Sequence, residues 1–121
     1  MPRKHHSLLA WRRAVDLVKL VYSATAGFPA SETYGLTGQM RRAAVSVPAN
    51  IAEGVGRAGN KDRIQFLVVA RGSLNELETY SVIVRELGYL QKTEELDSAI
   101  DSVAALLSGL INAERRKSDK S

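Results

Sequence analysis

The sequence contains no cysteine, which excludes disulfide bonds and thiolate metal sites. Aromatic residues make up only 6% of the chain, and its two histidines, His5 and His6, both lie among the first six residues. No apolar run approaches the roughly 18 residues that a membrane-spanning helix needs. The N-terminal stretch MPRKHHSLLAWRR also lacks the long apolar segment of a signal peptide. We therefore expect a cytoplasmic protein that does not associate with a membrane.

The size and composition of the chain indicate one globular domain. It has 121 residues, of which 45% are hydrophobic, and a net charge of +4. A chain of this length suits a single hydrophobic core. We expect one domain over residues 1–121, with flexible tails at residues 1–6 and 115–121.

Apolar residues recur with helical spacing along most of the sequence, and no segment alternates with the period of two that indicates a strand. Helices are predicted from Ser7 to Ala26, from Ser31 to about Arg57, from Asn60 to Leu87 and from Thr93 to about Leu110. Ser7, Ser31 and Asn60 are expected to cap the first three helices. Four helices with short connections predict an all-α fold, an antiparallel up-down-up-down four-helix bundle.

The stretch RRAAVSVPANIAEGVGRAG, residues 41–59, carries a proline within a helical pattern. The apolar positions keep their phase across Pro48, so one kinked helix is predicted rather than two helices. Ser46 and Asn50 lie near enough in the sequence to help satisfy the backbone groups that the proline frees.

Gly54, Gly56 and Gly59 form a G-x-G-x-x-G pattern at the end of this stretch. That pattern binds dinucleotides only where a strand leads into it and a helix follows. A helix leads into it here, so we interpret the glycines as a helix end and a turn that use positive φ angles.

Catalytic constellations are scarce. His5 and His6 are expected on a solvated tail rather than at a metal, and neither Ser46 nor Ser73 has a histidine partner in the body of the chain. Two of Glu53, Glu76 and Glu78 could form a carboxylate pair for acid–base chemistry, but the nearby arginines favour a buried ion-pair network between the second and third helices. The residues of this expected network are Arg41, Arg42, Asn50, Glu53, Arg71 and Glu76. We expect no catalytic residue, no metal and no cofactor, and hence no enzyme.

Two long stretches resemble one protein family. FPASETYGLTGQMRRAAVSVPANIAEGVGR and FLVVARGSLNELETY, together with WRRAVDLV and ELGYL, are similar to the four-helix-bundle proteins encoded by intervening sequences of bacterial 23S rRNA genes. The similarity covers about Leu8 to Leu110. Members are similar to the accessory protein of diversity-generating retroelements, a pentameric bundle that binds nucleic acid and a reverse transcriptase. The resemblance implies a homo-oligomer, with a homopentamer favoured, and no known catalytic activity.

Charge is expected to be unevenly distributed along such a bundle. Both termini and the connection between the second and third helices would share one end, where nine basic residues face three acidic residues, Asp62, Glu114 and Asp119, for a net charge of +6. The nine are Arg3, Lys4, Arg57, Lys61, Arg63, Arg115, Arg116, Lys117 and Lys120. Such an end could bind phosphate groups.

Two functions of different class remain open from the sequence. The first is a non-enzymatic, oligomeric scaffold or accessory factor that binds RNA or DNA through the basic residues. The second is a protein-interaction adaptor without direct nucleic-acid contact, whose partner could be an enzyme such as a reverse transcriptase. Oligomerisation is expected in both cases, because the predicted first and third helices carry more apolar surface than one four-helix core can cover.

Overall fold

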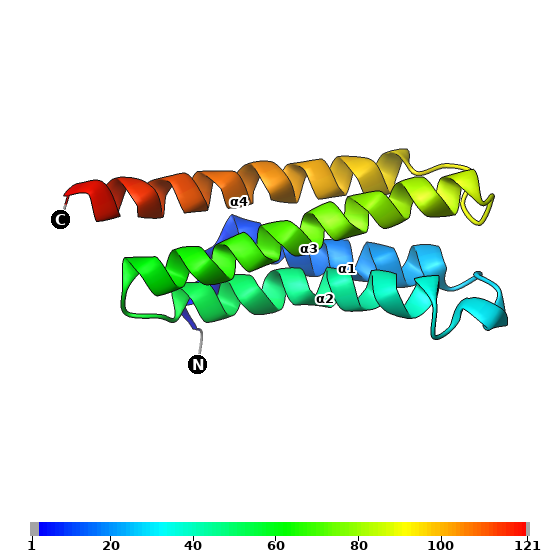
Figure 1. The fold of residues 1–121 in the computed structure, drawn as a ribbon, viewed down its shortest axis with the longest axis horizontal. Helices are drawn as coiled ribbons and strands as arrows, with labels where there is room; N and C mark the ends of the chain where they lie inside the picture. The colour runs from blue at the N-terminus through cyan, green and yellow to red at the C-terminus, as the bar shows by residue number, and fades with distance from the viewer. Residues whose placement is uncertain (1–2, 121) are drawn as a thin grey trace.

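The computed structural model describes residues 3–120, and most of these residues are helical (Figure 1). Short 3₁₀ turns, η1 and η2, precede the first two long helices. The elements are η1 (Lys4–Ser7), α1 (Leu9–Thr25), η2 (Ala30–Glu32), α2 (Leu36–Val55), α3 (Asn60–Glu86) and α4 (Glu94–Lys120). No strand occurs within these residues, as the sequence periodicity predicted.

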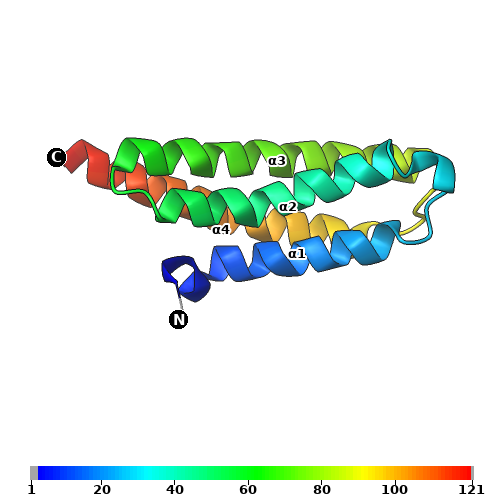
Figure 2. The same cartoon turned by 90° about the horizontal axis from the view of Figure 1, so that it is seen from below.

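The four long helices form a bundle in which each helix contacts two neighbours. α1 and α3 both pack against α2 and α4. Figures 1 and 2 show successive helices running in opposite directions, with the N-terminus, the α2–α3 connection and the C-terminus at one end. The α1–α2 and α3–α4 connections lie at the other end. This arrangement gathers three segments that are far apart in the sequence.

The core is made of aliphatic side chains from all four helices, with Leu17, Met40, Leu74 and Leu107 among the most deeply buried. By length and composition alone, residues Glu94–Ser118 of α4 could cross a membrane. Core helices of soluble bundles pass the same test, and the apolar seam of α4 lies within the bundle core. Leu96, Ile100, Val103 and Leu107 follow one another at heptad-like spacings of 4, 3 and 4 and are all buried, so this stripe of α4 faces the core.

The predicted caps of the first three helices are wrong, as are the predicted starts of the first two. Ser7 belongs to η1, and α1 begins at Leu9 after an extended Leu8. Ser31 lies in η2, and α2 begins only at Leu36, whose amide donates to the Glu32 carboxylate at 3.2 Å. Asn60 is already helical and follows Gly59. None of these three helices has a side-chain hydrogen bond from its N-cap residue.

Pro48 lies inside α2, which is continuous from Leu36 to Val55. The Asn50 amide group donates to the Ser46 carbonyl at 2.8 Å and to the Ser46 hydroxyl at 2.9 Å. In a regular helix the backbone amide of residue 48 would donate a hydrogen bond to the Ala44 carbonyl, and proline has no amide hydrogen to donate. The Ser46–Asn50 pair thus forms close to the proline but acts on a different carbonyl, and the kink itself stays a prediction.

The glycines of the G-x-G-x-x-G pattern do not use positive φ angles. Gly56 and Gly59 have φ angles of −82° and −98°, whereas the positive φ of 82° occurs at Gly88, just after α3. Gly54 is buried, and a Cβ there would lie 3.1 Å from the Arg63 carbonyl oxygen and 3.2 Å from the Phe66 Cβ. Gly54 therefore permits the close approach of α2 and α3 near their connection.

The chain ends differ from the expected tails in their secondary structure. α4 continues as a helix to Lys120, past the predicted end near Leu110. Figure 1 shows its last turns extending beyond the α2–α3 connection. Residues 4–7 form η1, which packs against α1 and α2. The flexibility of these ends stays a prediction, and Met1, Pro2 and Ser121 lie outside the described residues.

Candidate nucleic-acid interface

Three basic segments lie toward the end of the bundle that holds both termini (Figure 1). We call this region the basic end and define it by the eight residues Arg3, Lys4, Arg57, Lys61, Arg63, Arg115, Arg116 and Lys117. They come from the N-terminal segment, from the α2–α3 connection with the start of α3, and from the last turns of α4. The predicted ninth member, Lys120, has a side chain outside the described part of the structure.

Glu114 is the carboxylate that joins two of these segments, the start of α3 and the last turns of α4. Its side chain is 14% exposed and lies 3.6 Å from the Arg63 guanidinium and 3.5 Å from the Lys117 ammonium. The Asn60 amide group also donates to the Glu114 carboxylate. Glu114 therefore fixes the start of α3 against the last turns of α4, and it balances part of the charge of Arg63 and Lys117.

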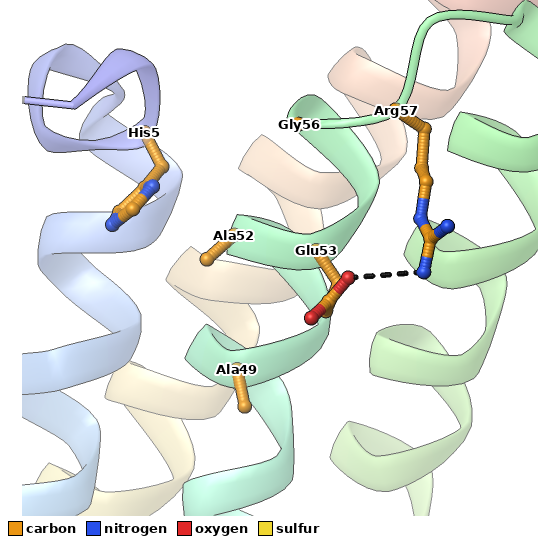
Figure 3. A pocket seen from close by; sticks show the side chains of 6 residues that line it. All are labelled: His5, Ala49, Ala52, Glu53, Gly56 and Arg57. Atoms are coloured by element: carbon orange, nitrogen blue, oxygen red, sulfur yellow. Dashed lines mark hydrogen bonds and ion pairs between the residues drawn. The ribbon is translucent and has the colours of Figure 1, made fainter.

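Arg57 connects the basic end to a hollow between η1 and α2 (Figure 3). Its guanidinium lies 3.2 Å from Glu53 and 4.7 Å from the centre of the Phe66 ring, and its carbonyl accepts a 2.7 Å hydrogen bond from Arg63. The hollow has a volume of about 480 Å³, and His5 faces it from the opposite wall. It is a polar depression with an arginine, a carboxylate and an imidazole at its rim.

His5 is half-buried, which corrects the expectation of a fully solvated tail. Its ring packs edge-on against Trp11 with the ring centres 5.0 Å apart. This contact holds η1 against the start of α1. Within the described residues, no group of three or more histidine, aspartate and glutamate side chains is arranged to hold a metal ion. The side chain of His6 lies outside that description.

Three cations of the basic end have no such carboxylate partner. Lys61, Arg115 and Arg116 are exposed, and within the described residues none has an ion pair shorter than 4.0 Å. Lys61 lies on the first turn of α3, and the two arginines lie on the last turns of α4. These are the groups best placed to contact an anionic ligand.

The predicted buried ion pair of Glu53 is wrong. Glu53 is 59% exposed and pairs with Arg57 one turn further along the chain, rather than with an arginine across the α2–α3 interface. Pairs of this kind contribute only about 0.3–0.5 kcal/mol. The helical phase placed Glu53 on the polar stripe of α2, but that stripe faces solvent at this level of the bundle.

The other residues of the expected network are also apart. Arg41 donates to the Thr25 hydroxyl at 2.9 Å and stacks on the Tyr22 ring at 4.4 Å, which joins α2 to α1 instead of α3. Neither Arg42 nor Arg71 has an ion pair shorter than 4.0 Å among the described residues. The network of arginines and glutamates between α2 and α3 is therefore absent from this part of the chain.

Hydroxyl groups form the polar contacts that do cross from α2 to α3. The Ser73 hydroxyl donates to the Ser46 hydroxyl at 2.8 Å, and the Tyr80 hydroxyl donates to Gln39 at 2.7 Å. Burial raises the pKa of Tyr80, and its hydrogen bond with Glu76 raises that pKa further. Glu76 thus accepts a hydrogen bond from a tyrosine on its own helix.

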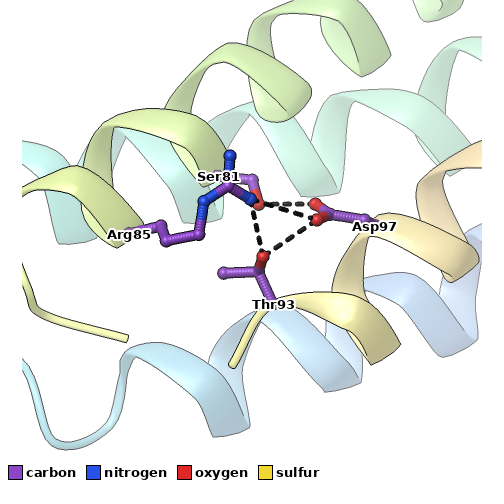
Figure 4. Close-up of polar contacts among 4 residues, drawn as sticks. All are labelled: Ser81, Arg85, Thr93 and Asp97. Atoms are coloured by element: carbon purple, nitrogen blue, oxygen red, sulfur yellow. Dashed lines mark hydrogen bonds and ion pairs between the residues drawn. The ribbon is translucent and has the colours of Figure 1, made fainter. Parts of the chain in front are cut away.

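The opposite end of the bundle is joined by Asp97, near the start of α4 (Figure 4). Its carboxylate accepts hydrogen bonds from the buried Ser81 hydroxyl at 2.6 Å and from the Thr93 hydroxyl at 2.9 Å. Arg85 approaches the same carboxylate at 3.5 Å and donates to Thr93 at 2.9 Å. The cluster connects α3 to the start of α4.

The roles of Glu114, Phe66 and Asn60 were not evident from the sequence. Glu114 stands first in the run ERRK, where it is simply one of three acids expected at this end. Its contact with Asn60 joins residues 54 positions apart, so no local spacing could reveal it. Phe66 falls within the apolar run FLVVA, and its contact with Arg57 depends on the path of the α2–α3 turn.

The fold and the basic end define an all-helical four-helix-bundle protein. Residues 6–109 match the profile of the family described as 23S rRNA-intervening sequence protein, and the chain belongs to that family. A solved structure of a protein of unknown function, from the S23 ribosomal protein family of Bacteroides thetaiotaomicron VPI-5482, is similar to this chain with a TM-score of 0.76.

That likeness covers 85% of this chain and 98% of the Bacteroides chain, at 18% sequence identity. It therefore supports the shared fold alone. No curated protein sequence matches the chain.

Proposed function

We propose that this protein is a non-enzymatic, homo-oligomeric scaffold that binds the phosphate backbone of RNA or DNA through its basic end. The observation that carries the proposal is the position of Lys61, Arg115 and Arg116. They are exposed, come from two segments that Glu114 holds together, and have no carboxylate within 4.0 Å among the described residues. Phosphate oxygens are the ligands that such cations favour.

Sequence-tolerant binding is expected from the composition of this end. Phe66, beside Arg57 of this end, is half-buried and covered by the Arg57 guanidinium, so it is not available for stacking on a base. Contacts to phosphates alone carry no sequence information. We therefore expect similar affinities for RNA and DNA of different sequences and a steep dependence on salt.

Oligomerisation is part of the proposal. Apolar side chains such as Leu9, Tyr22, Val45 and Val69 are between 43% and 52% exposed on the single chain. Exposed apolar surface on a bundle supports contact with further copies. The resemblance to the retroelement accessory protein favours five copies in a ring. Several basic ends on one assembly would raise the apparent affinity through avidity.

The test is a salt titration with a fluorescent RNA and a fluorescent duplex DNA. Replacing Lys61, Arg115 and Arg116 by alanine should weaken binding to both ligands and reduce the slope of log affinity against log salt by up to about 0.9 for each phosphate that is no longer neutralised. Lys92→Ala is the matched control, because Lys92 is exposed at the opposite end of the bundle. Unchanged binding in the triple variant, or no binding by the wild type at low salt, would favour the adaptor function.

A further inference from the structure

The outer face of α4 is uncharged over an unusual length for an exposed helix surface. From Ser102 to Ala113 the sequence SVAALLSGLINA carries no charged residue. Within and beside it, a heptad-spaced row of small or polar side chains points away from the core, and every member is exposed: Ser98, Ser102, Ala105, Gly109 and Asn112. This row is the surface analogue of a coiled-coil seam, with spacings of 4, 3, 4 and 3.

Gly109 has no explanation within the single chain. It lies in the interior of a 27-residue helix, where glycine is less favourable than alanine by about 1 kcal/mol. A Cβ placed there would meet nothing within 4 Å. A residue without a side chain on an exposed helix surface fits a site where another backbone approaches closely.

Charges of opposite sign flank the uncharged row. Glu94, Glu95 and Asp101 lie near the start of α4, and Arg115 and Arg116 lie near its end. All five are exposed, and within the described residues none has an ion pair shorter than 4.0 Å. The helix macrodipole favours acids at the start and bases at the end of a helix. It does not account for the uncharged residues between them.

From these observations we infer that the outer face of α4 is a contact for α4 of a second copy of this chain, packed antiparallel about a two-fold axis between Ala105 and Gly109. In this arrangement the acidic start of each helix lies beside the basic end of the other, twice by symmetry. A parallel pair would place like charges together at both ends. The last turns of α4, which extend past the bundle in Figure 1, would gain a partner.

The contact goes beyond the proposed nucleic-acid function, with which it shares Arg115 and Arg116, and it is separate from any ring contact. A ring of five uses a heterologous contact, whereas this pair joins the same face of two copies. The pairing involves only α4, so it can be tested in a dimer or in a larger assembly.

Single cysteines test the contact, because the chain has none of its own. With a short bismaleimide cross-linker, Ala105→Cys should give a covalent dimer in high yield. Ser98→Cys should give little, because in the antiparallel pair the two copies of that residue are roughly 27 Å apart along the axis, at about 1.5 Å per residue. Little cross-linking of Ala105→Cys, or equal cross-linking of both variants, would overturn the inference.

Glycine substitutions give a matched control for close approach. In the Ala105→Cys background, Gly109→Gln should lower the cross-linking yield several-fold, because the new side chain separates the helices. Gly72→Gln should leave it unchanged, since Gly72 is also an exposed helical glycine with nothing within 4 Å, but on α3. Circular dichroism would show that both variants keep their helices. Equal yields in the two variants would contradict the close approach at Gly109.

A charge exchange tests the orientation and separates it from nucleic-acid binding. Two double variants are made in the same Ala105→Cys background: Glu94→Lys with Glu95→Lys, and Arg115→Glu with Arg116→Glu. Each variant alone should lose the cross-link, because like charges then face one another in the pair. An equimolar mixture of the two variants should recover the cross-link as a mixed dimer. No recovery in the mixture would overturn the antiparallel arrangement. The first variant retains the basic end, so it should lose the cross-link and still bind nucleic acid. In the Ala105→Cys parent, nucleic-acid binding without the cross-link would overturn the α4 contact alone, and the cross-link without binding would overturn the proposed function alone.

Discussion

Both ends of the bundle join α3 to α4 through one carboxylate, and the two carboxylates differ in the groups that surround them. Asp97 has two hydroxyl donors, Ser81 and Thr93, and a single arginine at 3.5 Å. Glu114 has the Arg63 and Lys117 cations and the Asn60 amide. The Asp97 cluster is thus mainly a neutral hydrogen-bond network, whereas Glu114 lies among more positive charge than it can balance.

Because of this difference, we expect the Asp97 end to contribute to the stability of the fold and the Glu114 end to contribute to both stability and anion binding. At the Asp97 end the polar groups form hydrogen bonds with one another and fix the start of α4. At the Glu114 end one carboxylate orders two segments, and the cations Lys61, Arg115 and Arg116 remain exposed beside it. Changes at the first end should therefore alter the free energy of unfolding alone. Changes at the second end should alter both stability and the affinity for anions.

The largest expected effect on stability is that of Asp97→Ala. The substitution leaves the Ser81 hydroxyl, which is fully buried, without its 2.6 Å acceptor and removes the partner of Thr93. A buried polar group that loses its partner costs about 1–3 kcal/mol, and hydrogen bonds to a charged acceptor lie in the upper part of that range. We expect a loss of about 2–3 kcal/mol in urea unfolding.

Two controls sharpen the expectation for Asp97. Glu95→Ala removes an exposed carboxylate from the same turn and should change stability by less than about 0.5 kcal/mol. The double variant with Ser81→Ala should lose less than the sum of the single losses, because the two groups share one hydrogen bond. Additive losses would show that Asp97 stabilises the protein without Ser81.

A smaller loss of stability is expected for Glu114→Gln, together with a gain in the affinity for RNA. Loss of the charge beside Arg63 and Lys117 should lower the free energy of unfolding by about 1–2 kcal/mol, since Glu114 and Arg63 are only 14% and 22% exposed. The same change removes a negative charge from the basic end. If the proposed function holds, the affinity for RNA at low salt should rise while stability falls.

The control for Glu114→Gln is Glu53→Gln. It also removes a carboxylate beside a basic-end arginine, but Glu53 is 59% exposed, so stability should change by no more than about 0.5 kcal/mol. RNA affinity should rise in both variants. A rise in neither would separate Glu114 from binding and leave it a purely structural residue.

The sequence predicted the helices, the bundle and the three basic segments, because these depend on periodicity and chain connectivity. The apolar stripe of α4, for example, is both regular in sequence and buried in the structure. The partners of individual charges could not be predicted in the same way. Glu53 lies on the expected polar stripe, yet its ion-pair partner depends on which side of α2 is covered by the neighbouring helices. Glu114 joins α3 to α4 through Asn60, a residue 54 positions away in the sequence.

The smallest expected effect is a pH dependence at the Asp97 end, where the Tyr89 hydroxyl donates to Glu32 at 3.0 Å. This hydrogen bond raises the pKa of Tyr89 above its usual value of 10.0, and burial and the charge of Glu32 raise it further. A tyrosine whose pKa is raised by folding stabilises the folded state fully below about pH 10, and this contribution is lost as the pH rises through the folded-state pKa. Urea midpoints at about pH 8 and about pH 11 should therefore lie further apart in the wild type than in Tyr89→Phe. Tyr34→Phe, at a side chain that is 96% exposed, should retain the wild-type difference. Equal pH dependence in the wild type and Tyr89→Phe would show that the Tyr89–Glu32 hydrogen bond does not contribute to stability.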